Sequence, residues 1–340
     1  MNNVFIIGNG FDLDLGLPTK YSDFAASKYW PSSTSKTKIP SEEIQNNNGV
    51  LNLHIVAATP KLEAAIEEAK NRETWFDLES ELLWYSKQFD VTDRNYTRFS
   101  RESPNEVKSN VDYFNKLRNS LNDYILEVQS KHQIKKDCTA KDVLKSVVNN
   151  GYFDNIYSFN YTDLNSIARM VGVTSDIQYI HLHGNVTDKT SILGVDETEL
   201  RKGYESFHKS SSRYYRSHDI YNSLTSAEEI VIFGLSFGSI DYSYFDIFFK
   251  QLSEGESVME EQKKFITIFT KDDNSRLSII TNLRNMGINI QRLYAQSHFQ
   301  IICTSDDGEK KALSDFYNRL AANSLLVYDN NFNNLAMLMP

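Results

Sequence analysis

The sequence predicts an α/β fold, with a doubly wound and mostly parallel sheet that is interrupted by a large helical insertion. Residues 4–7 (Val-Phe-Ile-Ile) form an apolar run near the N-terminus that ends at Gly8. Such a run is typical of a strand buried on both faces, as in the middle of a parallel sheet. Similar short runs return after residue 150, whereas residues 29–141 mainly show apolar residues at helical spacing.

Length and composition indicate a folded globular chain. It has 340 residues, of which 40% are apolar and 24% are charged, as in ordinary globular proteins with one large core or two smaller ones. The net charge is -9, and there is no long run of lysine and arginine. Both features argue against an affinity that comes from neutralising the phosphates of nucleic acid. A nucleic-acid partner is therefore not expected.

Cysteine usage and the N-terminal sequence predict a cytoplasmic protein. Cys138 and Cys303 are the only cysteines, too few and too far apart for a cysteine zinc site or a disulfide framework. The chain begins directly with a predicted strand, without a signal peptide, and no apolar run approaches membrane-spanning length. We expect no metal, no required cofactor and no membrane segment.

The loop after the first strand reads Gly8-Asn9-Gly10-Phe11-Asp12, and residues 16–19 (Gly-Leu-Pro-Thr) complete it. The two glycines at positions 8 and 10 allow a sharp turn and a close approach of a ligand. Free backbone N–H groups can then hold a pyrophosphate at the carboxyl end of the strand. In this interpretation, valine at Gly10 weakens nucleotide binding without unfolding the sheet. A tight turn without a ligand explains the same residues equally well.

Apolar residues at helical spacing predict that helical hairpins interrupt the sheet. Helices are predicted at 62–69, 75–84 and 113–127, and polar segments predict loops at 31–48 and 90–110. Trp75, Phe76 and Trp84 are expected in the core of this insertion. The predicted domains are a Rossmann-like nucleotide-binding core (1–28 and 142–305), the helical insertion (29–141), and a C-terminal helix and tail (306–340).

The sheet pattern resumes after the insertion. Strands are predicted near 155–159, 177–182, 229–234, 264–269 and 288–293, with helices at 164–171, 275–286 and 311–321. We expect the first strand, near 3–8, to lie centrally and parallel to its neighbours. Residues 196–221, rich in aromatic and hydroxyl side chains, are expected to form a lid or the wall of a pocket. No structure is predicted for the Asn-rich residues after 321.

Polar side chains follow several predicted strands where these strands end. If the strands are parallel, their ends bring together Asn9, Asp12, Asn160, Thr162, His183, Ser236 and Asp241. His181 and His183 alternate along a strand and point to opposite faces, which does not suit a shared metal ion. His181 is expected to be a hydrogen-bonded core residue, and His183, beside Gly184, a functional one. Asp12 is equally well explained as a cap of the turn or helix.

Several of these segments resemble known families. The first loop is similar to the sirtuin segment G-A-G-I-S-x-x-x-G-I-P, and Ser158-Phe159-Asn160 is similar to the sirtuin segment T-Q-N. His183-Gly184 resembles the catalytic H-G of sirtuins, and Gly234-Leu235-Ser236 resembles their G-T-S loop. The four segments occur in the same order as in sirtuins. The chain resembles the AbiH family of bacterial abortive-infection proteins more closely. That resemblance rests on N-G-F-D-L-x-x-G-L-P-T-x-Y-x-D-F from Asn9, W-F-D-L-E-x-x-L from Trp75, S-F-N-Y-T from Ser158, H-L-H-G from His181, and F-G-x-S-x-x-x-x-D-x-x-Y-F ending at Phe245.

The AbiH resemblance implies a role in abortive phage defence, and the sirtuin-like relation implies cleavage of NAD. The first loop departs from the sirtuin pattern at Asn9 and Asp12, and the aspartate expected two residues after Asn160 is replaced by Thr162, with Asp163 one place later. The absence of zinc-binding cysteines argues against protein deacylation. The resemblance thus implies an NAD glycohydrolase that releases nicotinamide, with NAD as its substrate.

The resemblance also implies roles for individual residues. Asn160 orders the attacking water and the ribose, and His183 acts as general base, a task suited to an imidazole that titrates near neutrality. The nucleotide-binding residues are Gly8, Asn9, Gly10, Phe11, Asp12, Pro18, Thr162, Gly234, Ser236 and Asp241. In this picture the first loop holds the pyrophosphate and Ser236 faces the adenosine ribose. A second copy of the chain and a phage-derived trigger are the further partners that we expect.

Two alternatives remain open. One is a binding module, in which the pocket senses NAD, ADP-ribose or another nucleotide and the insertion transmits this state within a defence complex. The other is an enzyme that acts on a different nucleotide, or that cleaves nucleic acid through acidic residues such as Asp12 and Asp241. The negative net charge disfavours nucleic-acid cleavage. Release of nicotinamide from NAD separates the glycohydrolase from both alternatives.

Overall fold

The computed structural model describes residues 2–31, 61–72, 77–87, 102–149, 151, 153–173, 177–196, 199–216, 218–256 and 258–336. The chain divides into two compact units. Unit 1 comprises residues 1–20, 125–192 and 212–340, and unit 2 comprises residues 21–124 and 193–211. Unit 1 contains the sheet and unit 2 is helical. Unit 2 overlaps the expected insertion at 29–141, but it begins and ends earlier and includes a second segment.

Unit 1 is built on a six-stranded sheet whose order is β3-β2-β1-β4-β5-β6, with every described pair parallel. The strands are β1 (Asn2–Ile7), β2 (Asn155–Ser158), β3 (Tyr179–His181), β4 (Ala227–Phe233), β5 (Lys264–Thr270) and β6 (Ser297–Cys303). This strand order is that of Rossmann-type sheets. The predicted α/β class and the interior position of the first strand are therefore confirmed.

β1 lies inside the sheet because both of its faces are apolar. Val4, Phe5 and Ile6 are fully buried. Val4 lies opposite Asn155 on β2 and opposite Ile230 on β4, so β1 is hydrogen-bonded on both sides. A strand without a polar face is stable where helices cover both faces of its sheet.

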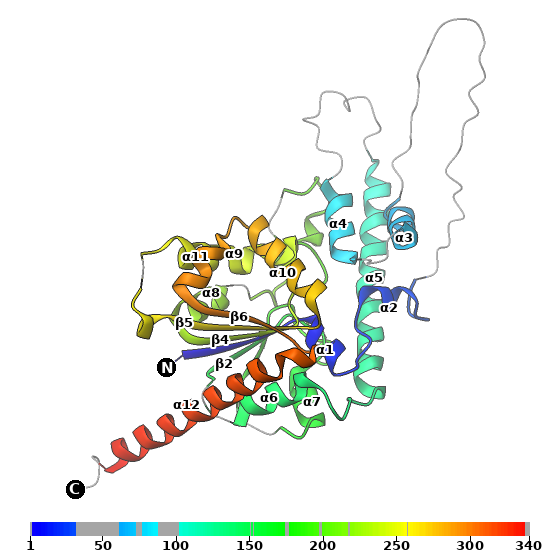
Figure 1. Cartoon of the computed structure of the whole chain (residues 1–340). Coiled ribbons are helices and arrows are strands. Elements are labelled where there is room, and N and C mark those ends of the chain that lie inside the picture. Colours follow the sequence, from blue (N-terminus) through cyan, green and yellow to red (C-terminus); the bar gives the residue numbers. More distant parts are fainter. Residues whose placement is uncertain are drawn as a thin grey trace, which may run out of the picture. The chain divides into compact units, whose positions relative to one another are not determined.

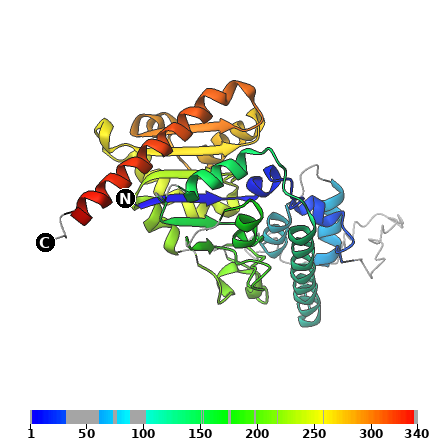
Figure 2. The ribbon, with the colours of Figure 1, turned by 90° about the horizontal axis from the view of Figure 1, so that it is seen from below.

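Helices cover both faces of this sheet (Figure 1). One face is covered by α8 (His218–Ser226), α9 (Tyr242–Glu254), α10 (Asp273–Asn285) and α11 (Ile290–Gln296), whose apolar side chains form one cluster with those of β1, β4 and β5. α6 (Thr139–Asn149) and α12 (Lys310–Ala336) lie on the other face, where α12 crosses the strands beside α6 (Figure 2). Arg319 ties α12 to the sheet through hydrogen bonds to both carboxylate oxygens of the buried Glu229, at 2.8 and 3.1 Å.

Unit 2 contains α2 (Tyr21–Ala25), α3 (Leu62–Arg72), α4 (Leu78–Lys87) and most of α5 (Pro104–Lys131), which continues into unit 1 after Tyr124.

Helices were correctly predicted at α3, α4 and α5, but the predicted loop at 90–110 is wrong from Pro104 onward. There, Ser103 and Glu106 form a capping box that starts α5. Trp84 is 46% exposed and is not a core residue. Trp75, Phe76 and most of the predicted loop at 31–48 lie outside the described residues.

Three predictions for unit 1 are wrong. Residues 9–14, predicted as part of the loop after the first strand, form the helix α1 (Asn9–Asp14). Residues 288–293 do not form a strand, because the side chain of Asn289 accepts a hydrogen bond from the N–H of Arg292 (3.1 Å) and caps α11. The strand at this point of the sheet is β6, which follows α11. The Asn-rich tail is not without structure, since α12 continues to Ala336. The stretch at 196–221 is divided between the two units, and its last residues begin α8.

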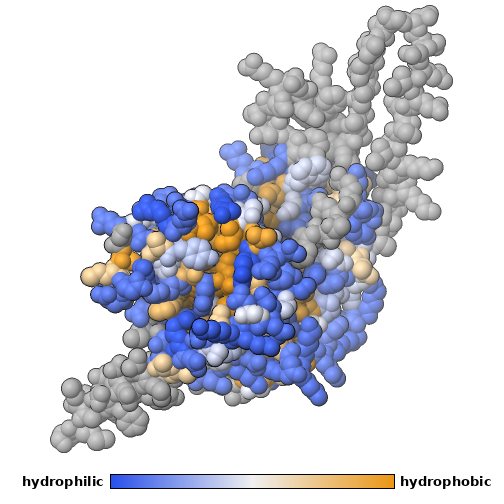
Figure 3. Space-filling model, viewed as in Figure 1, coloured by the Kyte–Doolittle hydropathy of each residue, from blue (hydrophilic) through white to orange (hydrophobic). Residues whose placement is uncertain are grey.

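The surface of unit 1 carries apolar side chains on three neighbouring helices. Ile247 on α9, Leu277 on α10 and Tyr294 on α11 are 54%, 64% and 50% exposed. Figure 3 shows apolar residues gathered on the face viewed there. In the described part of the chain, no helix has the length and apolar character needed to cross a membrane.

Candidate functional site

Side chains that follow β1 and β2 are joined at the carboxyl ends of these strands. Asp12 lies on α1 (Asn9–Asp14), and its Oδ2 accepts a hydrogen bond of 2.9 Å from Thr162 Oγ1. Asn160 Nδ2 donates to the carbonyl oxygen of Gly8 over 3.1 Å. All three side-chain groups are buried, with Asp12 2%, Asn160 6% and Thr162 3% exposed. Parallel strand ends therefore bring these predicted residues together.

His183 follows β3 and lies against the same loop. Its ring contacts Phe159 and Tyr161, which flank Asn160, at centroid distances of 5.3 and 6.5 Å. His183 Nε2 is 3.3 Å from the hydroxyl oxygen of Tyr244 on α9. The ring is thus held by aromatic groups and by the Tyr244 hydroxyl, and the residue is 5% exposed.

Asp12 exchanges a proton near neutral pH. Burial raises the pKa of Asp12 from 3.8 to about 7, although hydrogen bonds with Thr162 and Asn160 oppose this rise. Desolvation disfavours the charged form of a carboxyl group, whereas donated hydrogen bonds favour it. The carboxyl end of β1 therefore contains an acid that is partly ionised at pH 7.

Glycines let the turns after β1 and β4 touch. Gly234 has a φ of +71°, and a Cβ atom built on it would lie 2.3 Å from the backbone nitrogen of Phe11. A Cβ atom on Gly10 would lie 2.6 Å from Gly234 Cα. Valine at Gly10 would therefore displace the turn after β4. The expected loss of nucleotide binding without unfolding of the sheet stays a prediction, but the variant would also disturb this contact between the two turns.

The backbone donors of the glycine loop are used within the chain. The N–H groups of Gly8 and Gly10 donate to the carbonyl oxygens of Phe233 and Gly234, each over 2.8 Å, and Phe11 N–H donates to Gly8 O over 2.9 Å. A pyrophosphate held by these three N–H groups would have to replace these bonds. The structure thus matches the tight-turn interpretation of Gly8 and Gly10.

The other predicted binding residues lie in different surroundings. Asn9 Oδ1 accepts a hydrogen bond from Thr19 Oγ1 over 2.5 Å, next to Pro18. Phe11 is fully buried and packs edge-on against Phe5 and Phe233, so its side chain belongs to the core.

The predicted binding residues after β4 lie nearer the surface. Ser236 is exposed, and its carbonyl oxygen accepts a hydrogen bond from Asn282 on α10 (2.9 Å). Asp241 is half-buried and ends a short 3-10 helix (Ser239–Asp241) before α9.

Comparison with known families identifies the chain. A family model described as "Bacteriophage abortive infection AbiH" matches residues 4–260. The chain belongs to the AbiH family. No curated protein matches the chain. The AbiH match begins in β1 and ends before β5, so it includes every residue of the candidate site, and its description assigns the family to abortive infection of bacteriophage.

In this AbiH chain, two departures from the sirtuin pattern are bonded to each other. Asp12 stands where the sirtuin segment has serine, and Thr162 stands where it has aspartate; the resulting carboxylate and hydroxyl form the 2.9 Å hydrogen bond described above. The neighbouring Asp163 caps α7 (Leu164–Met170), because its carboxylate accepts from the N–H groups of Asn165 and Ser166. Asp163 is therefore engaged in capping.

His181 has the structural place that was expected for it. Its Nε2 accepts a hydrogen bond of 3.0 Å from the backbone N–H of Leu164. Burial lowers the pKa of His181, and the neighbouring Asp163 opposes this shift. The prediction of a hydrogen-bonded core histidine is confirmed. Among the described residues, no group of three or more His, Cys, Asp or Glu side chains is placed to bind a metal ion.

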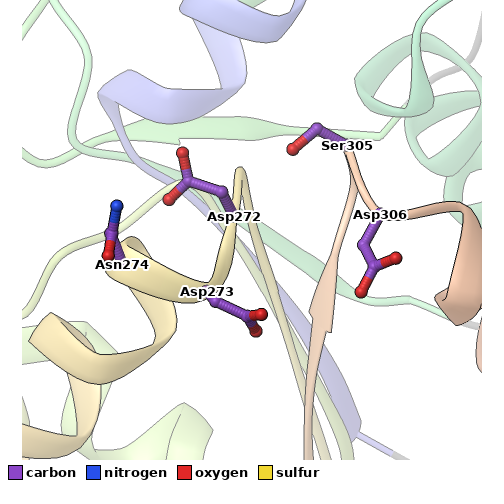
Figure 4. Close-up of a pocket in the computed structure, with 5 residues that line it drawn as sticks. All are labelled: Asp272, Asp273, Asn274, Ser305 and Asp306. Carbon is purple, nitrogen blue, oxygen red and sulfur yellow. The ribbon is translucent and has the colours of Figure 1, made fainter.

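A pocket at the carboxyl ends of β5 and β6 is polar (Figure 4). It is lined by Asp272, Asp273, Asn274, Ser305 and Asp306. Asp272 caps α10 by accepting from Ser275, and Asp306 accepts from the N–H of Gly308 over 2.8 Å. Asp273 lies 3.4 Å from Arg276. These carboxylates therefore bond to the local backbone and form ion pairs, Asp273 with Arg276 and Asp272 with Lys271 (3.8 Å). None of the residues predicted for the site lines this pocket.

Sequence reasoning missed a buried charged cluster in unit 2 of this AbiH chain. The ammonium of Lys209, which is fully buried, lies 3.1 Å from Glu79 Oε2 and 3.9 Å from Asp196 Oδ2. Burial raises the pKa of Glu79, and Lys209 opposes this rise. Glu79 belongs to the W-F-D-L-E motif, which was the signal available in the sequence. The cluster links α4 to residues 193–211 within unit 2.

Proposed function

We propose that this AbiH protein is an NAD glycohydrolase that acts in abortive phage defence. One observation carries the proposal: Asn160 and His183 lie in adjoining positions at the carboxyl ends of β2 and β3, beside Asp12 and the glycine turn. In open parallel sheets, this edge is where nucleotides bind and where reactive side chains gather. The similarity of these segments to sirtuin motifs supports NAD as the nucleotide.

The proposed reaction is hydrolysis of the N-glycosidic bond between nicotinamide and ribose. The bond from the ribose C1′ to the nicotinamide nitrogen breaks, and nicotinamide leaves with the bonding electrons as a neutral molecule. A water oxygen bonds to C1′ and passes one proton to His183. The transition state is oxocarbenium-like and needs an oriented water molecule. Asn160 orders this water and the ribose hydroxyls, and the products are ADP-ribose and nicotinamide.

Burial of the site bears on how the activity is regulated. Asn160 and His183 are 6% and 5% exposed in the isolated chain. Admission of NAD requires that neighbouring side chains move, which agrees with an enzyme that is silent until infection. We propose that a phage-derived factor or assembly of several copies opens the site. The activity is therefore to be measured with and without phage lysate, together with the size of the protein in solution.

Alanine at Asn160 or His183 is expected to lower NAD turnover on the order of a hundredfold or more, because each change removes a group that acts on the reacting water. Release of nicotinamide by the purified full chain measures this effect. His132→Ala is the matched control, since His132 lies at the end of α5 and bonds only to its own helix in the described contacts. Its turnover is expected to equal that of the parent.

Two outcomes would contradict this proposal. If the parent chain releases no nicotinamide under any condition, but binds ADP-ribose, the nucleotide-sensing alternative is correct. Turnover that survives in His183→Ala would remove His183 from the mechanism. The internal bonds of the glycine-loop N–H groups argue equally against a preformed pyrophosphate site in the enzyme and in the sensor. Protection against phage, measured in the same variants, connects turnover to defence.

A further inference from the structure

A buried amide on α5 is hydrogen-bonded to two loops at the candidate site. Gln129 lies near the C-terminal end of α5, in the part of this helix that belongs to unit 1, and it is 8% exposed. Its Oε1 accepts a hydrogen bond of 2.7 Å from the backbone N–H of Asp163, and its Nε2 donates to Thr187 Oγ1 over 3.2 Å. The reaction proposed above gives this residue no task.

The two partners of Gln129 stand close in the chain to Asn160 and His183. Asp163 comes three residues after Asn160, in the loop between β2 and α7, and Thr187 comes four residues after His183, in the turn after β3. All of these residues belong to unit 1. Gln129 therefore bridges the loop that carries the proposed water-ordering amide and the turn that carries the proposed general base.

A backbone hydrogen bond also connects these two segments. Val186 N–H donates to the carbonyl oxygen of Tyr161 over 2.9 Å. His181 Nε2 accepts from Leu164 N–H over 3.0 Å and ties the same loop to the end of β3, but not to the turn beyond it. A single hydrogen bond tolerates a broad range of angles at its acceptor, so the loop and the turn are able to pivot about it. Gln129 adds a second point of attachment from a helix, which fixes their distance and their rotation together.

The chemistry of its two partners fixes the orientation of the Gln129 amide. A backbone N–H is able only to donate, so the Asp163 N–H must meet Oε1, and the two donors of Nε2 then lie on the side of Thr187. The Thr187 hydroxyl accepts one of these donors. Because a buried amide is destabilising when its groups lack partners, the two bonds together hold the side chain in one orientation.

We propose that Gln129 is a positioning residue that fixes the spacing between Asn160 and His183. It acts through the backbone of Asp163 and the hydroxyl of Thr187. Two groups that act on one water molecule must lie within about 0.5 Å of the productive geometry, and the side chains behind them provide this precision. The effect on turnover rests on the proposed NAD cleavage, whereas the attachment of the loop to the turn does not.

Hydrogen exchange of the Asp163 amide tests the bridge without any ligand. In the full chain, this N–H is buried and bonded to Gln129, so it exchanges slowly. Gln129→Met keeps a side chain of similar length but removes both polar groups. The Asp163 N–H, followed by NMR of the ¹⁵N-labelled full chain, is therefore expected to exchange on the order of tenfold faster, the effect of one lost hydrogen bond. Ser130→Ala is the matched control on α5 and is expected to leave this rate unchanged, because Ser130 is exposed and its hydroxyl bonds to its own helix.

Thr187 tests the other end of the bridge. Its side chain is exposed, so a substitution there leaves the core intact. Thr187→Val keeps the shape of the side chain and removes the oxygen that accepts from Nε2, whereas Thr187→Ser keeps this oxygen. We expect the valine variant to lower turnover and the serine variant to match the parent. This pair keeps the proposal testable if Gln129→Met does not fold.

Turnover connects the bridge to function. Gln129→Met and Thr187→Val are each expected to lower kcat on the order of tenfold to a hundredfold with little change in KM, because a misplacement of about 1 Å costs up to a hundredfold. The double variant is expected to lose no more than Gln129→Met alone, since both changes break the same bridge. Nicotinamide release is measured under the conditions in which the parent is active, and Ser130→Ala is expected to equal the parent.

Failure of this proposal is distinguishable from failure of the proposed function. Exchange of the Asp163 N–H that is equal in the parent and in Gln129→Met overturns the bridge, whatever the activity. Faster exchange with unchanged kcat, or losses in kcat that add in the double variant, overturns the positioning role. A parent chain that never releases nicotinamide overturns the glycohydrolase, and faster exchange in Gln129→Met then still supports the attachment of the loop to the turn.

Discussion

Alanine at Gly234 is expected to lower the free energy of unfolding by about 3–5 kcal/mol, from backbone strain and steric overlap together. Gly234 has a φ of +71°, and a Cβ atom there would lie 2.3 Å from Phe11 N and 2.4 Å from the carbonyl carbon of Gly10. These are backbone atoms of α1, which follows the central strand, so neither can move without shifting the loop. Urea-induced unfolding of unit 1, followed by circular dichroism, measures the change.

Gly172 offers a matched control for this substitution. It follows α7 in unit 1 and has a φ of +76°, but a Cβ atom there would meet no atom within 4 Å. Alanine at Gly172 is therefore expected to cost only the strain of the left-handed conformation, about 1–2 kcal/mol. Equal losses in the two variants would show that backbone strain alone decides the effect. In that case, the close contact between the turns after β1 and β4 would not contribute to stability.

Methionine at Lys209 is expected to lower the stability of unit 2 by about 3–5 kcal/mol, because it leaves two buried carboxylates without the ammonium between them. These carboxylates belong to Glu79 and Asp196. The exposed control is Lys131→Met, since Lys131 is 66% exposed and pairs with Glu127 one helical turn away. Its thermal midpoint is expected to equal that of the parent.

A double variant separates the lost ion pair from the lost volume. Glu79→Gln together with Lys209→Met removes one charge of each sign from the cluster. It is expected to be more stable than Lys209→Met alone, because fewer uncompensated carboxylates remain buried. If the double variant is instead as unstable as the sum of the two single variants, Lys209 acts by packing rather than through its charge.

The sheet was largely predictable because its strands are short apolar runs in an otherwise polar chain. β1, β4 and β5 are buried on both faces, so their sequences are short continuous apolar runs. Such runs differ from the spaced apolar residues of a helix that is buried on one face. The segment 288–293 was misassigned because its alternating apolar residues also fit a helix, and the cap at Asn289 decided between the two. α12 was predicted too short, since the low helix propensity of asparagine ended the prediction early.

The candidate site was predictable as a set of strand ends, but not as a set of bonds. The carboxyl ends of parallel strands share one edge, which places Asn160 and His183 in the same region. The bond between Asp12 and Thr162 joins residues far apart in the chain, and nothing local in either segment indicates it. The same is true of Lys209 and Glu79, whose burial depends on how residues 193–211 fold within unit 2.

The position of β1 also affects the order in which the protein is able to fold. Val4 emerges first during synthesis, yet its partner on one side is Asn155 and on the other side Ile230. At about 5–20 residues per second, the ribosome needs roughly 10–45 s to reach the second partner. Both edges of this apolar strand are unpaired until β2 is made, and one edge stays unpaired until β4 is made; the residues of α2 to α5 are made before β2. Rapid translation, or a chaperone that holds the first strand, should therefore increase the yield of folded protein, whereas a pause before β4 should favour aggregation.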